Sequence, residues 1–85
     1  MRNPSSDDWA FVVELGRRIR LSRRCQGLTQ EEVGDRAGLS RSCVAVFEAG
    51  RGGIDVVTLR RIAAALGLSL PELVDVPASG REEAR

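Results

Sequence analysis

The chain has 85 residues, of which 42% are hydrophobic and 29% charged, and its formal net charge is +1. This length allows a single domain with one modest core and excludes a two-domain enzyme, because small chains bury a limited share of their surface. The composition is that of a folded soluble protein and excludes a disordered chain or a membrane protein. All 13 basic residues are Arg.

Residue types that carry metal or nucleophilic chemistry are scarce. The chain has no His and two cysteines, Cys25 and Cys43, without C-x-x-C spacing. This excludes a structural zinc site and a Cys–His nucleophile, so we predict no metal and no cofactor. We interpret both cysteines as small apolar helical residues, with redox sensing as the alternative. The longest apolar stretch, residues 9–13, is too short for a membrane span, which predicts a cytoplasmic protein.

The first predicted elements are a flexible polar lead-in, residues 1–7, and a helix that starts near Asp8 and runs to Cys25. Apolar residues recur in this helix at helical spacing, and Gly27 ends it. These apolar residues are Phe11, Val12, Leu15 and Ile19.

Two short helices with a tight turn between them follow. Thr29 and Glu32 form a capping box, which starts a helix that Gly38 ends. Ser40 can cap the next helix, residues 41–49. Its inward face is Val44 and Phe47, and its other face is Arg41, Ser42, Ala45 and Val46.

Two further helices complete the predicted fold. Asp55 caps the first of them, and Ser69 and Glu72 form a capping box for the second. The apolar residues of the two helices are Leu59, Ile62, Ala63, Leu66, Leu73 and Val74. Strand-period alternation is lacking, so we predict an all-α domain of five short helices over residues 8–76, followed by a disordered tail, residues 77–85.

The stretch LTQEEVGDRAGLSRSCVAVFEAGR, residues 28–51, resembles the helix-turn-helix of the Cro and phage-repressor family, also called the xenobiotic-response-element type. LGRRIRLSRR resembles the family's first helix, and TLRRIAAALGLSLPEL resembles its fourth and fifth, so the likeness covers residues 9–75. It implies a lambda-repressor-like DNA-binding domain whose helix-turn-helix spans residues 29–48. Two short helices around a tight turn agree with that docking geometry.

The resemblance also implies which residues contact the DNA backbone. Thr29 and Gln30 occupy the start of the helix that commonly contacts a phosphate, although Gln30 can equally be an exposed helix former. Arg51, with the N–H groups of Gly52 and Gly53, matches a phosphate contact in the following loop, with a plain connector as the alternative. That loop lacks the G-K-[ST] ending of a nucleotide-binding loop.

The resemblance places Arg41 and Ser42 at the base-reading positions, where Arg can pair bidentately with guanine. Ala45 and Val46 match the next groove-facing positions and can contact only a thymine methyl. Val46 departs from the family's usual polar residue, which leaves open that it serves a protein contact.

Three residues have implied structural roles. Arg23 and Glu48 match a pair that links the first helix to the end of the recognition helix through a charge-assisted hydrogen bond. Gly34 stands where the family keeps a small residue, so that the recognition helix can approach closely.

The leading hypothesis is therefore a sequence-specific regulator, a repressor or autoregulator, that binds double-stranded DNA as a homodimer on a palindromic operator. Its dimer surface is expected on apolar residues that exceed what so small a core can bury. These residues are Val57, Leu68, Leu70, Val74 and Val76.

Two other function classes were weighed. An antitoxin or protein-interaction module would use the same fold with a protein partner, and Val46, Trp9 and Phe11, all expected to be exposed, motivate it. An enzyme is excluded because the carboxylates are accounted for by helix caps and by surface pairs such as Glu32 with Arg36.

Overall fold

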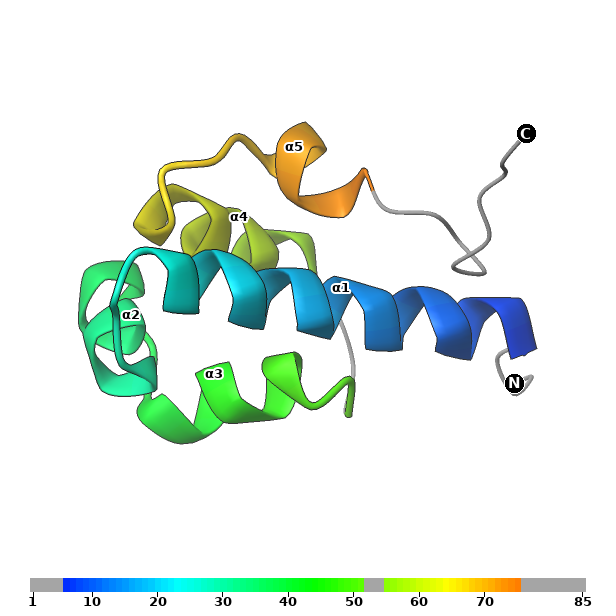
Figure 1. Ribbon diagram of the computed structural model, residues 1–85, viewed down its shortest axis with the longest axis horizontal. Helices are drawn as coiled ribbons and strands as arrows, with labels where there is room; N and C mark the ends of the chain where they lie inside the picture. The colour runs from blue at the N-terminus through cyan, green and yellow to red at the C-terminus, as the bar shows by residue number, and fades with distance from the viewer. Residues whose placement is uncertain (1–5, 52–54, 76–85) are drawn as a thin grey trace.

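The computed structural model describes residues 6–51 and 55–75, and every regular element in these ranges is an α-helix (Figure 1). The helices are α1 (Ser6–Cys25), α2 (Gln30–Ala37), α3 (Arg41–Glu48), α4 (Val56–Ala65) and α5 (Leu70–Val74). The predicted five-helix all-α fold is confirmed, with α1 starting at Ser6 rather than near Asp8. The predicted tail, residues 77–85, lies outside the described residues, as do Gly52, Gly53 and Val76.

The long helix α1 runs through the middle of the molecule, with α3 on one side and α4 and α5 on the other (Figure 1). The α2 helix lies at the end where α1 finishes. All five helices contribute to one core. Its largest fully buried side chains are Leu15, Ile19, Val33, Val44, Ile62 and Leu73. The predicted inward positions are confirmed, because Val44 is fully buried and Phe47 packs against the core.

Three connections share one sequence pattern, Gly-Leu followed by Thr or Ser, at residues 27–29, 38–40 and 67–69. In each, the Gly adopts a left-handed conformation with φ between 71° and 75°, which costs glycine little because it has no Cβ. The N–H of the following Leu donates to the carbonyl five residues earlier, at 3.1, 2.8 and 2.8 Å. The Thr or Ser oxygen then accepts an N–H of the next helix, at 3.0, 3.0 and 3.2 Å. Only three or four residues therefore separate the end of one helix from the start of the next.

Two helical glycines allow backbone segments to approach closely. A Cβ on Gly34 would lie 2.6 Å from the carbonyl oxygen of Leu39, in the turn before α3. A Cβ on Gly16 would lie 2.6 Å from the carbonyl oxygens of both Phe47 and Glu48, at the end of α3. The small residue predicted at Gly34 is thus confirmed, with the turn as its neighbour, whereas the role of Gly16 was not predicted.

Candidate nucleic-acid interface

The α3 helix presents a continuous accessible face. Ser40 caps α3, since its Oγ accepts the N–H of Cys43 at 3.0 Å. Arg41 and Ser42 are exposed directly after this cap, Ala45 is half-buried, and Val46 is 41% exposed. All four residues predicted to face the groove therefore lie on the accessible side of α3, opposite the buried Val44.

The predicted pair of Arg23 and Glu48 is present and links α1 to the last turn of α3. The Arg23 guanidinium donates from Nε to Glu48 Oε2 at 2.5 Å and from Nη2 to Oε1 at 3.0 Å. Its Nη1 donates to the Leu28 carbonyl at 2.8 Å, in the turn before α2. The side chains are only 12% and 4% exposed, so water screens this contact little. The bond to Glu48 also raises the pKa of Arg23.

Gln30 joins the same network from the first turn of α2. Its Nε2 donates to Glu48 Oε1 at 3.1 Å, so one carboxylate receives hydrogen bonds from both α1 and α2. This contact was not predicted, because it joins residues 18 positions apart in the sequence. The Glu48 carboxylate therefore fixes the relative positions of α1, α2 and α3.

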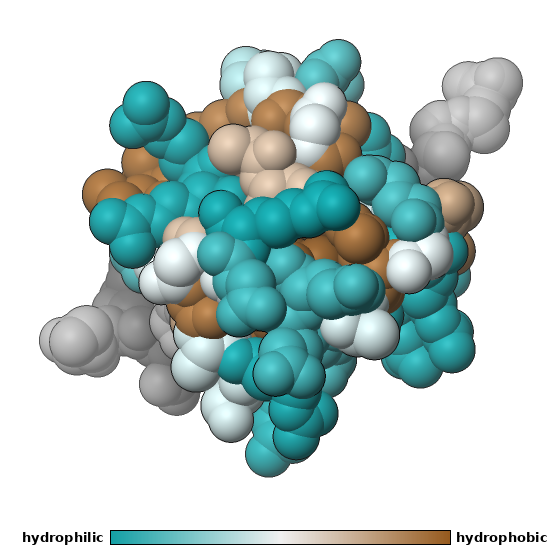
Figure 2. All heavy atoms as spheres, turned by 90° about the vertical axis from the view of Figure 1, so that its left-hand side faces the viewer, coloured by the Kyte–Doolittle hydropathy of each residue, from teal (hydrophilic) through white to brown (hydrophobic). Residues whose placement is uncertain are grey.

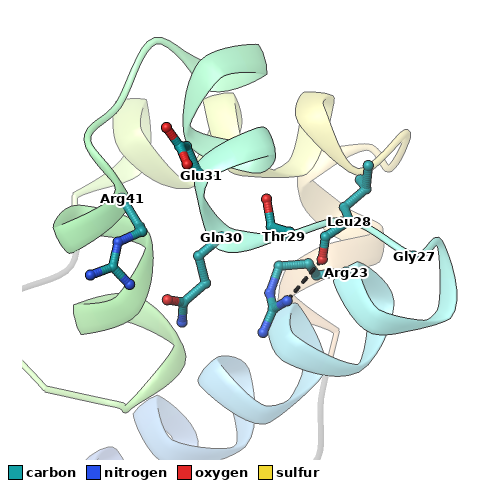
Figure 3. Close-up of a pocket in the computed structure, with 7 residues that line it drawn as sticks. All are labelled: Arg23, Gly27, Leu28, Thr29, Gln30, Glu31 and Arg41. Carbon is teal, nitrogen blue, oxygen red and sulfur yellow. Dashed lines mark hydrogen bonds between the residues drawn. The ribbon is translucent and has the colours of Figure 1, made fainter.

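An open groove lies beside this network, between the start of α2 and the start of α3 (Figure 3). Its volume is about 500 Å³. The polar ends of Arg23, Gln30 and Arg41 point toward the same side of the groove, whereas Glu31 points away from them (Figure 3). Within the described residues, Arg41 takes part in no ion pair or side-chain hydrogen bond and is free to contact a ligand.

The remaining predicted backbone contacts are accessible as well. Thr29 is exposed, and its hydroxyl oxygen accepts the N–H of Glu32 at 3.0 Å. Arg51 is exposed three residues after the end of α3, and its own N–H donates to the Val46 carbonyl at 3.1 Å.

The residues expected at a dimer surface divide into two groups. Val57 is 58% exposed at the start of α4, beside Val56, which is 65% exposed and was not predicted. Leu68, Leu70 and Val74 are instead partly buried against the core. Apolar residues that sequence reasoning counted as surplus therefore contribute, in part, to the core.

Two other expectations need correction. Trp9 is 49% exposed as expected, but Phe11 is partly buried and packs against the core. Glu32 forms no ion pair with Arg36, since its carboxylate accepts the Thr29 N–H at 2.8 Å and completes the capping box. Arg36 instead donates to the Ala65 carbonyl at 3.4 Å.

No helix among the described residues is long and apolar enough to cross a membrane. Over residues 6–51 and 55–75, no three His, Cys, Asp or Glu side chains come together as a metal site. Both cysteines are free, with Cys25 exposed and Cys43 half-buried.

Comparisons with known proteins agree on one family. Residues 14–76 match the model of the helix-turn-helix domain. An uncharacterized HTH-type transcriptional regulator of Sinorhizobium fredii is 50% identical over 52 residues, which cover 61% of this chain and 68% of that protein. The immunity repressor protein of Bacillus phage phi105 is 35% identical over 71 residues, 84% of this chain and 49% of the repressor.

A solved structure has the same arrangement of helices. The restriction-modification controller protein C.AhdI from Aeromonas hydrophila superposes with a TM-score of 0.70 at 35% sequence identity. The match covers 73% of this chain and 94% of the controller protein.

Proposed function

The chain belongs to the family of helix-turn-helix transcriptional regulators, and from this premise we propose that it binds a palindromic DNA operator as a homodimer and represses transcription, its own included. One observation carries the proposal: α3 exposes Arg41 and Ser42 at its start while the Arg23–Glu48 pair holds its last turn against α1. A short, firmly held helix with a polar leading end is what enters a major groove. Repression is supported by the likeness to a phage immunity repressor.

Base reading is assigned to the exposed face of α3. The Arg41 guanidinium has the fork geometry that pairs with O6 and N7 of a guanine. Ser42 donates or accepts at a neighbouring base, whereas Ala45 and Val46 contact a thymine methyl through their own methyl groups. Specificity therefore rests mainly on Arg41.

Backbone contacts are assigned to the edges of the groove. Gln30 stands in the first turn of α2, where the helix dipole favours an anion, and its amide retains a second N–H beside the one given to Glu48. Thr29 and Arg51 add two further contacts to phosphates. These contacts position α3 without carrying sequence information.

The dimer surface is assigned to the start of α4 and to α5, with Val57 at its centre. Among the described residues predicted for the interface, Val57 is the most exposed, while Leu70 and Val74 contribute their accessible parts. A two-fold dimer places two recognition helices on half-sites about one DNA turn apart. We assign the protein no catalytic role and place its action in the cytoplasm, on the nucleoid.

The test of base reading is a binding-site selection with the whole chain, followed by Arg41→Ala. We expect the variant to lose about 1 to 3 kcal/mol on the selected site and to relax preference at one guanine. Its affinity for random DNA is expected to fall much less. Gln30→Ala is the contrasting variant and should weaken both DNAs alike. A mutant that returns the same consensus with uniformly weaker binding would make Arg41 a phosphate contact.

The test of the dimer is Val57→Asp, chosen because an exposed position tolerates a charge without loss of the fold. Sedimentation should show a folded monomer with poor operator affinity. An unchanged mass would move the interface to another surface, of which the projecting start of α1 with Trp9 is the next choice.

A second candidate function is a protein-interaction module with weak or no DNA binding. The exposed apolar side chains of Val46 and Trp9, at 41% and 49%, favour it. Salt-dependent retention on DNA discriminates between the two functions, because only phosphate contacts release counterions.

A further inference from the structure

The accessible face of α1 carries three arginines at helical spacing, Arg17, Arg20 and Arg24. Together with Leu21 they line a hollow of about 280 Å³. Only Arg17 has an acidic partner, Glu14 at 3.2 Å, and that pair is exposed. Within the described residues, Arg20 and Arg24 take part in no ion pair or side-chain hydrogen bond. The face therefore presents positive charge that the fold leaves uncompensated.

This arrangement opposes the stability of the isolated helix. Arg20 and Arg24 are four residues apart, and like charges at that spacing on a helix repel each other. Leu21 is 58% exposed between them, so the basic side chains do not serve to cover an apolar surface there. An anion bound in the hollow would relieve the repulsion.

Arg20 connects this face to the recognition helix. It lines a second hollow, of about 240 Å³, whose other walls include Gln30 at the start of α2, Ala45 on α3 and Ala49 directly after α3. The two alanines are small, so the space beside the last turn of α3 stays open. Arg20 therefore lies beside the end of α3, whereas Gln30 also lines the groove at the start of α3, where Arg41 stands.

The acidic side chain that lines the hollow with Arg20 is already hydrogen-bonded to other residues. Glu48 lines the hollow with Arg20, but its two oxygens accept hydrogen bonds from Arg23 and Gln30. Figure 2 views the molecule from the α2 end, and hydrophilic residues cover the centre and lower part of this face, toward α3. Arg20 and Arg24, which have no ion pair among the described residues, add positive charge beside the recognition helix.

We propose that α1 is a second phosphate-binding segment, in which Arg20 contacts the DNA strand that flanks the major groove and Arg24 extends this contact along the same strand. The inference rests on the proposed function and adds residues outside the helix-turn-helix to the interface. Such contacts act on all DNA sequences equally, because phosphates carry no sequence information.

The experiment measures the affinity of the full chain for its selected operator and for a random duplex of equal length, between 50 and 300 mM salt. Arg20→Gln is expected to weaken both DNAs by the same factor, about three- to tenfold, and to reduce the salt slope by about 1. Arg24→Gln should give a smaller loss in the same direction. Arg20→Lys keeps the charge and should restore most of the slope, which a structural role would not require.

Arg36→Gln is the matched control, because Arg36 is an exposed helical arginine in the last turn of α2 whose side chain donates to the Ala65 carbonyl and lines neither hollow. It should leave the affinity and the slope unchanged. If Arg20→Gln behaves like this control, or weakens only the operator, the role of α1 is overturned while the proposed function stands. If the wild-type chain binds neither duplex, the proposed function fails, and the inference fails with it.

Discussion

The same Gly-Leu-Ser turn joins α2 to α3 and α4 to α5, and in both places the Leu N–H donates to the carbonyl five residues earlier and the Ser Oγ accepts an N–H of the next helix. The residue whose carbonyl receives the Leu N–H differs: it is Gly34 in the first pair and Ala63 in the second. A Cβ on Gly34 would lie 2.6 Å from the Leu39 carbonyl oxygen, whereas Ala63 is buried with its Cβ in place. The turn sequence determines where the helices stop and start. The residue that accepts the Leu N–H, Gly34 or Ala63, determines how closely the turn can pack on the preceding helix.

The largest effect is expected from Gly34→Val. A side chain there must displace backbone, so we expect a loss of about 3 kcal/mol in the free energy of unfolding, measured by urea titration, together with weaker operator binding. Ala63→Gly is the matched change in the other pair. It should cost about 2 kcal/mol, through helix propensity and the loss of a buried methyl group, and leave DNA affinity unchanged. A larger loss for Ala63→Gly would contradict the difference drawn between the two turns.

The second-largest effect is expected from Glu48→Ala, because hydrogen bonds from Arg23 and Gln30 to this carboxylate connect α1, α2 and α3. Removal of the carboxylate leaves Arg23 without its main partner in a site where the side chain is 12% exposed. We expect a loss of about 2 to 3 kcal/mol in thermal or urea unfolding. Glu14→Ala breaks an exposed pair and should cost well under about 1 kcal/mol. Equal losses of stability in Glu48→Ala and Glu14→Ala would contradict a role of this network in holding α3.

The third-largest effect on stability is expected from removal of the two serine caps. Ser40→Ala and Ser69→Ala each remove one hydrogen bond to an N–H in the first turn of a helix, and each should cost about 1 kcal/mol. Only Ser40→Ala is expected to weaken DNA binding, since only α3 carries the recognition face. A parallel loss of affinity in Ser69→Ala would make the effect one of stability alone.

The smallest expected effect is a pH dependence of the stability, which arises from the two capping boxes. The N–H of Thr29 lowers the pKa of Glu32, and the N–H of Ser69 lowers the pKa of Glu72. A lowered folded pKa gives stability that is present above the unfolded pKa and is lost as the pH falls through the folded one. Tm should therefore decline in acid, and Glu32→Gln or Glu72→Gln should flatten that decline. A steeper decline in either variant would contradict the sign.

These comparisons also show what the sequence predicts well. The helix boundaries from Gly27 onward were predictable because they carry local signals, such as Thr29 and Glu32 or the Gly38 stop, whereas the start of α1 was placed two residues late. The Arg23–Glu48 pair followed from resemblance, not from spacing. The contact of Gln30 with Glu48 and the approach at Gly16 depend on how helices cross, which no local pattern records. Apolar content likewise did not distinguish core from interface, so Leu70 was assigned to the surface alone.

The close approach of α1 to α3 has a mechanical consequence. At Gly16 the two backbones meet without an intervening side chain, and the carbonyls of Phe47 and Glu48 leave no space for sliding. On the other side of this contact, a Cβ on Gly50 would lie 3.0 Å from the Cα of Val13. Any larger residue at position 16 would therefore push the end of α3 away from α1, so this one position sets the spacing between the two helices.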